Sequence, residues 1–149
     1  MTRPDRIVVG VDGSSAADEA LAWAMHEAQL RGADLEVIHA WEFPVWALTR
    51  FGDAALPVFT PEDLEKAAEE LVHDAVLRVR GDTSSVAMTT DVVRGHPADV
   101  LVERSKGASL LVVGSQGHGG FTGMLLGSVS DQVAHHATCP VAVVRGDRN

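Results

Sequence analysis

The sequence predicts a single α/β domain, with a parallel sheet covered by helices on both faces. Three observations support this fold class. Short apolar runs alternate with longer segments of helical character along the whole chain. Most of the runs are continuously apolar and rich in valine, leucine and isoleucine, as in strands buried on both faces. The length of 149 residues suits one domain over residues 1–149.

Five apolar runs are the expected strands. The first, "RIVVGVD", ends at an Asp-Gly pair that favours a turn, and the third is the most polar of the set. In chain order, the expected strands are residues 6–12, 35–41, 85–93, 109–114 and 140–145.

Four segments between these runs carry the start and stop signals of helices. Prolines near the starts and glycines just past the ends are typical of helix boundaries. The expected helices are residues 16–31, 60–81, 96–107 and about 128–136. A serine or threonine followed three residues later by aspartate predicts a capping box. Three of the expected helices have such a pair at their start: Ser15 with Asp18, Thr60 with Asp63, and Ser128 with Asp131.

Residues 42–59 form a connection that is long for a compact domain. Together with Trp41 the segment holds five of the seven aromatic residues in the chain. Two interpretations remain open: the aromatic side chains pack the connection onto the sheet, or they form a surface that contacts a ligand or partner.

Charge and cysteine content exclude several classes of protein. The formal net charge of −9 argues against general nucleic-acid binding and against attraction to an anionic membrane. The one cysteine, Cys139, allows no disulfide within the chain and fits a reducing compartment. Neither a signal peptide nor an apolar stretch of membrane-spanning length is present, so a cytoplasmic location is expected.

A glycine-rich window, residues 114–130, follows the fourth expected strand and leads into the last helix. In open α/β sheets, ligands bind beyond the carboxyl ends of strands, and a helix N-terminus there can hold an anion. Glycines would let the backbone approach a phosphate, and serine hydroxyls in the first helical turn would add donors. Neither GxxxxGK[ST] nor GxGxxG occurs in the window.

The window instead contains Gly-x-x-Gly, nine residues, then Gly-Ser, running from Gly114 and Gly117 to Gly127 and Ser128. In this motif the chain resembles the ATP-binding branch of the universal stress protein family. The resemblance covers nearly the whole chain, including "IVVGVDGS", "VIHAW", "VVRGHPADVLVE", "LLVVGSQGHGG", "LLGSVS" and "CPVAVVR".

The resemblance implies a doubly wound, Rossmann-like sheet in the order 3-2-1-4-5, with ATP bound where strands one and four part. Mg²⁺ is expected to accompany the ATP. Asp12 would accept hydrogen bonds from the ribose, although an Asp-Gly pair is also a common turn former. The backbone of Ala40 would contact adenine. Val113 and Gly114 would lie along the nucleoside. The residues expected around the phosphates are Gly117, Gly127, Ser128, Val129 and Ser130.

Histidines elsewhere give weaker signals. His135, His136 and Cys139 invite a metal interpretation, but adjacent helical residues point about 100° apart and no fourth ligand is nearby. No metal site is therefore expected. His118 lies in the glycine window and could contact a phosphate, whereas His39 is expected to pack within the second strand.

No catalytic constellation is recognisable in the sequence. A G-x-S-x-G nucleophile motif is absent, and the only two lysines lie outside the window. The expected function is an ATP-binding stress sensor or signalling module with an unidentified signalling partner. The alternatives are a slow ATPase and a binder of another adenine nucleotide, such as AMP or cyclic AMP. A homodimer through the last strand, Pro140 to Arg145, is also expected, because an apolar edge strand invites pairing and the resemblance implies it.

Overall fold

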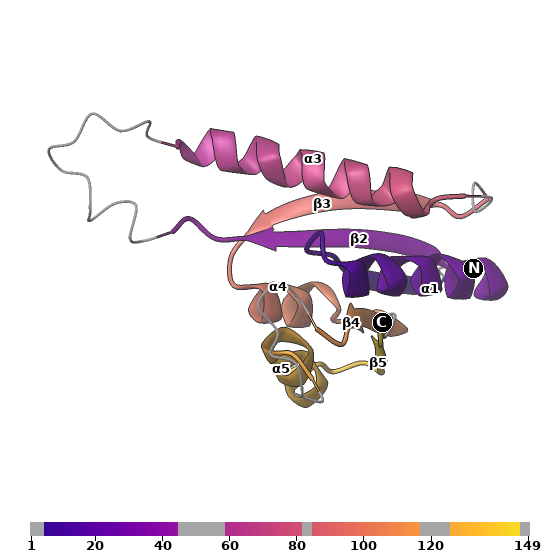
Figure 1. The fold of residues 1–149 in the computed structure, drawn as a ribbon. Helices are drawn as coiled ribbons and strands as arrows, with labels where there is room; N and C mark the ends of the chain where they lie inside the picture. The colour runs from indigo at the N-terminus through magenta and orange to yellow at the C-terminus, as the bar shows by residue number, and fades with distance from the viewer. Residues whose placement is uncertain (1–4, 45–58, 82–84, 117–125, 147–149) are drawn as a thin grey trace, which may run out of the picture.

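The computed structural model describes residues 5–44, 59–81, 85–116 and 126–146, which form a five-stranded parallel sheet with helices on both faces (Figure 1). The strand order β3-β2-β1-β4-β5 confirms the expected fold class and order. The elements are β1 Arg6–Gly10, α1 Ser15–Arg31, β2 Asp34–Trp41, α3 Pro61–Val79, β3 Met88–Arg94, α4 Pro97–Arg104, β4 Leu110–Gly114, α5 Ser128–His136 and β5 Val141–Val144.

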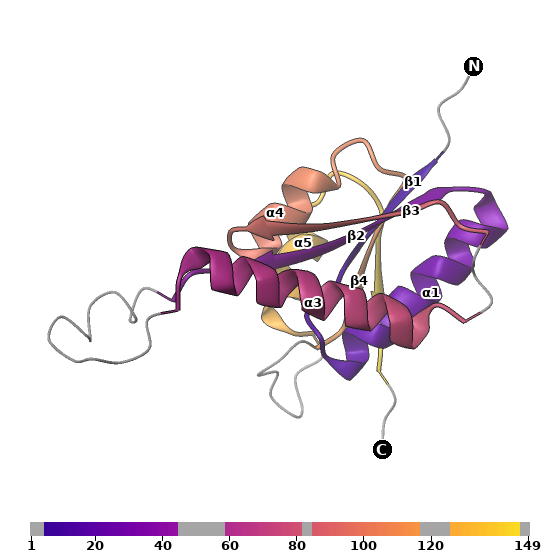
Figure 2. The same ribbon diagram turned by 90° about the horizontal axis from the view of Figure 1, so that it is seen from above.

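The helices form two layers, with α1 and α3 together on one face of the sheet and α4 and α5 on the other (Figures 1 and 2). Successive residues of β2 enter different cores. Leu35 and Val37 belong to the core under α1 and α3, whereas Ile38 belongs to the core under α4 and α5. Burial on both faces explains why the central strands are almost continuously apolar.

The first helix begins one residue earlier than the sequence pattern indicated. Ser14 is the N-cap of α1, and its hydroxyl accepts the N–H of Ala17 at 3.1 Å. The expected capping box of Ser15 with Asp18 is therefore wrong. Ser15 is already the first helical residue, and Asp18 pairs with Arg78 on α3 at 3.0 Å. With two adjacent serines, local sequence could not decide which one caps the helix.

The capping box of Thr60 with Asp63 is confirmed at the start of α3. The Thr60 hydroxyl accepts the Asp63 N–H at 3.1 Å, and the Asp63 carboxylate accepts the Thr60 N–H at 3.0 Å. The hydrogen bonds that Thr60 provides to this carboxylate, from its backbone first and its side chain second, favour the ionised form and lower the pKa of Asp63 below its ordinary value of 3.8.

A charged cluster that the sequence did not reveal ties α4 to the sheet. The Glu36 carboxylate on β2 accepts from both Arg6 and Arg104, and Arg104 also donates to Asp91 on β3 at 2.8 Å. The hydrogen bond to Asp91, followed by that to Glu36, raises the pKa of Arg104. Arg6 additionally donates to the carbonyl oxygens of Arg104 and Lys106, both at 2.9 Å. These bonds satisfy carbonyls where α4 ends, earlier than the expected residue 107.

Candidate functional site

The candidate site lies at the carboxyl ends of β1, β2 and β4 and at the start of α5. The sheet order makes β1 the neighbour of both β2 and β4. The chain leaves β1 into α1 on one face of the sheet and returns along β4 from α4 on the other face. The connections therefore diverge between β1 and β4, which is where ligands bind in open α/β folds.

Asp12 follows β1 and shapes the turn into α1. One of its carboxylate oxygens, Oδ1, accepts the backbone N–H of Ser14 at 2.9 Å and the Ser14 hydroxyl at 2.5 Å. The same serine caps α1, so Asp12 holds the cap in place. The turn-forming role weighed for Asp12 is thus present. A contact between its half-buried carboxylate and a ribose stays a prediction.

Gly114 ends β4 directly against the first turn of α1. A Cβ atom at this position would lie 2.9 Å from both the carbonyl carbon and the oxygen of Ala16. Glycine is needed here because the backbones of β4 and α1 approach closely. The glycine motif in the sequence had been interpreted only in terms of nucleotide binding. The neighbouring Val113 side chain is buried in the core under α4 and α5, so its backbone is what borders the site.

The start of α5 is fastened to the end of β4. Gly127 is the N-cap of α5, and its N–H donates to the carbonyl oxygen of Ser115 at 2.6 Å. The Ser130 hydroxyl, in a residue only 2% exposed, is shared between the carbonyl oxygens of Ser115 at 3.1 Å and Gly127 at 3.0 Å. Ser130 is therefore placed at the site, with its hydroxyl hydrogen directed at the protein backbone.

The expected capping box of Ser128 with Asp131 is wrong, because Ser128 is the first residue inside α5 and no side chain caps this helix. The N–H groups of Ser128, Val129 and Ser130 belong to the first turn and have no acceptor within the helix. The Ser128 side chain is exposed beside them. Gly127 has a φ of −70°, which other residues also adopt, so backbone conformation alone does not require glycine there.

Gly117 and His118 lie outside the described residues, as do Trp46 and Phe51 of the long connection. At the two ends of that connection, Phe43 is half-buried and Phe59 is 66% exposed. The Arg94 guanidinium lies 5.7 Å from the ring centroid of Trp41 and 5.8 Å from that of Phe43. Packing and partner binding both remain open for this segment.

Ala40 lies near the end of β2 and turns its backbone groups toward the space beyond β1. Alternate residues of a parallel strand bond the same neighbouring strand. The Ile38 carbonyl accepts the N–H of Val11, so the N–H and C=O of Ala40 point toward the same side. Because β1 ends at Gly10, these groups face the candidate site. His39 does not simply pack, since its Nδ1 lies 2.8 Å from the carbonyl oxygen of Val11.

His96 is a further residue at this edge of the sheet that the sequence did not assign. It is the N-cap of α4, and its Nε2 lies 3.3 Å from the Gln132 side-chain oxygen on α5. Its Nδ1 lies 3.6 Å from the Glu42 carboxylate beyond β2. The imidazole ring thus links the start of α4 to α5 and to the segment that follows β2.

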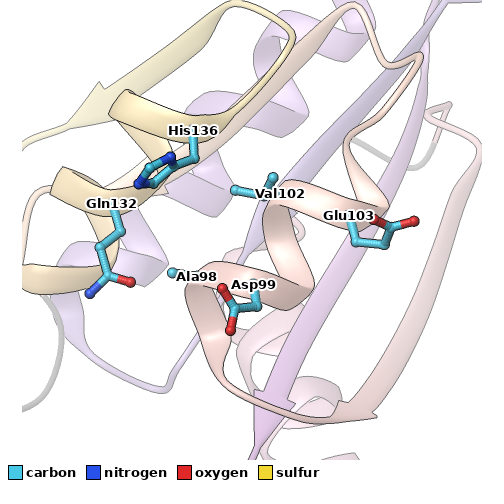
Figure 3. A pocket seen from close by; sticks show the side chains of 6 residues that line it. All are labelled: Ala98, Asp99, Val102, Glu103, Gln132 and His136. Atoms are coloured by element: carbon cyan, nitrogen blue, oxygen red, sulfur yellow. The ribbon is translucent and has the colours of Figure 1, made fainter.

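A separate hollow of about 280 Å³ lies on the outer surface, between α4 and α5 (Figure 3). Its lining consists of Ala98, Asp99, Val102, Glu103, Gln132 and His136. None of the residues expected to bind nucleotide lines it. Nearby, the Nδ1 of His135 lies 2.8 Å from the carbonyl oxygen of Asp131. In the described part of the chain, no three His, Cys, Asp or Glu side chains are arranged to hold a metal ion.

Comparisons with known proteins agree on one family. A model of the universal stress protein family matches residues 4–145. A universal stress protein of Mycolicibacterium smegmatis is 41% identical over 141 residues, which cover 93% of this chain and 45% of that protein. The chain spans about half the length of the curated relatives it matches.

Solved structures with the same architecture include two with nucleotides. A universal stress protein in complex with cAMP is 26% identical with a TM-score of 0.66, covering 98% of this chain and 100% of that one. A universal stress protein of Archaeoglobus fulgidus in complex with dAMP is 25% identical with a TM-score of 0.68, covering 97% and 99%. Among the described helices of this chain, none is both long enough and apolar enough to cross a membrane.

Proposed function

The chain belongs to the universal stress protein family, and on that basis we propose that it binds ATP with Mg²⁺ at the carboxyl ends of β1, β2 and β4. The observation that carries the proposal is the fastened start of α5, whose first-turn N–H groups lie beside the end of β4. Such a helix start attracts phosphate through its free donors and its dipole.

Each part of the nucleotide has a proposed partner. Adenine lies against the backbone N–H and C=O of Ala40, and the ribose lies near Asp12. The phosphates approach the Ser128 hydroxyl and the N–H groups of Val129 and Ser130, with Gly117 and Gly127 allowing close contact. Mg²⁺ supplies positive charge for the phosphates, because none of these residues is a lysine or arginine.

We propose a sensor or signalling role rather than an enzymatic one. Backbone N–H groups and serine hydroxyls hold phosphates in the ground state, whereas catalysis requires tighter binding of the transition state. Phosphoryl transfer normally uses a positioned cation and a residue that orients the nucleophile. The proposed ligand set has no cationic side chain. The cytoplasmic location and the signalling partner both stay predictions.

An adenosine monophosphate is the second candidate ligand. Two solved relatives were determined with cAMP and with dAMP, which are both monophosphates. Mass spectrometry of the compound released from purified protein, followed by calorimetric titration with ATP, AMP and cAMP, separates the candidates. Released ATP, with tighter binding of ATP than of AMP or cAMP, would support the proposal. A released monophosphate that binds more tightly than ATP would replace it.

We also propose a homodimer through β5. Among the described residues, this strand pairs only with β4. Its four residues are three valines and one alanine, and all four are half-buried. Such an apolar edge favours strand pairing with a second copy. Light scattering at micromolar concentration should give the mass of a dimer, and a monomer would contradict the proposal.

A further inference from the structure

The hydrogen-bonded pairing of β1 with β2 lacks one backbone hydrogen bond that a regular continuation of the two strands would form. The paired residues run from Arg6 with Asp34 to Gly10 with Ile38, and Val11 still donates its N–H to the Ile38 carbonyl at 2.9 Å. In a regular parallel ladder, the next bond would run from the N–H of Ala40 to the carbonyl of Val11. That bond is not formed between these two described residues, and the ladder ends at Gly10.

The side chain of His39 occupies the position that the missing bond leaves. Its Nδ1 lies 2.8 Å from the Val11 carbonyl oxygen. A carbonyl oxygen can only accept, so Nδ1 carries the hydrogen and donates it. The imidazole thereby satisfies a carbonyl at the edge of the core, where Val11 is 5% exposed and an unpaired oxygen would be costly.

We propose that His39 is a positioning residue for recognition of the nucleotide base. By taking the Val11 carbonyl, His39 leaves the N–H of Ala40 available to a ligand instead of to β1. Strand β2 itself stays in place, because its pairing with β3 continues through Ala40 with Val93 to Trp41 with Arg94. The inference rests on the proposed adenine site and adds the residue that keeps its backbone donor free.

A free N–H beside a C=O of the same residue selects between purines. Adenine presents an acceptor, N1, next to a donor, its 6-amino group, which complements the N–H and C=O of Ala40. Guanine presents a donor at N1 next to an acceptor at O6, the reverse pattern. A site that leaves buried polar groups unpaired rejects the wrong ligand, so His39 contributes to preference for adenine.

Two variants separate positioning from simple packing. In His39→Asn, the amide nitrogen stands where Nδ1 stood and can still donate to Val11. His39→Leu keeps a side chain of similar bulk but has no donor. We expect His39→Leu to lower the affinity for ATP about tenfold, the free-energy difference of one hydrogen bond, and to reduce the preference for ATP over GTP. His39→Asn should retain both properties to within about threefold.

Amide hydrogen exchange on the ligand-free protein tests the same inference without any nucleotide. The Ala40 amide should exchange more slowly in His39→Leu than in the wild type, because it gains the Val11 carbonyl as acceptor. Unchanged Ala40 exchange together with unchanged ATP affinity in His39→Leu would overturn the inference. So would equal losses in the Asn and Leu variants.

The wild type alone offers a third readout if His39→Leu fails to fold. Long-range proton–nitrogen NMR spectra should show the hydrogen of His39 on Nδ1, and a hydrogen on Nε2 alone would contradict the inference. Failure of the proposed function is distinguishable. If the wild type binds no adenine nucleotide, the proposed function is wrong. The hydrogen-exchange and NMR measurements then still show whether the His39 side chain, rather than the Ala40 N–H, bonds the Val11 carbonyl.

Discussion

The hydroxyl of Ser130 lies 3.1 Å from the carbonyl oxygen of Ser115, which joins the first turn of α5 to the residue after β4. The same hydroxyl lies 3.0 Å from the carbonyl oxygen of Gly127. Because Ser130 is buried, water cannot replace these interactions if the hydroxyl is removed. The orientation of the proposed phosphate-binding turn thus depends on a side chain that points away from solvent.

Ser130→Ala and Ser128→Ala should therefore have different effects. Removing the buried Ser130 hydroxyl should lower the free energy of unfolding by about 1 kcal/mol, because the hydrogen bond that it shares between two carbonyls is lost. Each carbonyl keeps a backbone donor, the Gly127 N–H on Ser115 and the Asp131 N–H on Gly127. Removing the exposed Ser128 hydroxyl should leave stability nearly unchanged and weaken ATP binding more than AMP binding. Urea unfolding and calorimetric titration of both variants provide the test. A stable Ser130→Ala variant would mean that the fastening is dispensable.

Gly114→Ala should destabilise the fold by about 1–3 kcal/mol, the range typical of overpacking. Its added methyl group would lie 2.9 Å from backbone atoms of Ala16, which cannot move without shifting α1. Gly146→Ala is a matched control, because its Cβ would meet the same residue at 3.2 Å or more. Thermal unfolding should show the larger decrease in Tm for Gly114→Ala, and equal decreases would refute the close-approach explanation.

The capping box of α3 should give stability a defined pH dependence. The pKa of Asp63 is lowered in the folded state by its hydrogen bonds with Thr60, so ionised Asp63 stabilises the fold at pH values above 3.8. That contribution is lost as the pH falls through the folded-state pKa. Asp63→Asn should accordingly be less stable than the wild type at neutral pH, and the difference should shrink on acidification. Urea midpoints measured across this pH range would show a constant difference if the carboxylate had no such role.

ATP hydrolysis should be slow, on the order of turnovers per hour, because an arginine finger alone is worth ~10³-fold or more in nucleotide hydrolases. No such cation is among the proposed ligand residues. A steady-state assay with pure protein and Mg²⁺ measures the rate. Turnover faster than about one per second that disappears in Ser128→Ala would identify an enzyme instead of a sensor.

Local sequence patterns predicted the strands and helices of the fold, because buried strands and helix boundaries have recognisable sequences. The order of the strands followed from the family resemblance instead. The apolar runs predicted all five strands, and Thr60 with Asp63 marked the start of α3. Contacts between distant residues left no such pattern. The bond from His39 to Val11 spans 28 positions, and the Arg6 contacts with α4 span about 100.

The sequence predicted which residues lie at the candidate site, but not which atoms they contact within the protein. A serine in the first turn of a helix can direct its hydroxyl to a ligand or to a backbone carbonyl, and local sequence does not distinguish the two. The structure shows the second orientation for Ser130. Gly114 was correctly placed at the end of β4, but its close approach to Ala16 depends on how α1 packs.

Calorimetric titration of Gly127→Val with ATP and Mg²⁺ tests the proposed site most directly. Gly127 caps α5 with a φ that valine can adopt, so its backbone conformation does not prevent the substitution. A branched side chain at this position would stand where we propose that phosphate approaches the first-turn N–H groups. The wild type should bind ATP, and a folded Gly127→Val variant should bind it at least about 100-fold more weakly, a loss of about 2.7 kcal/mol. Undiminished ATP affinity in a folded Gly127→Val protein would show that the nucleotide binds elsewhere.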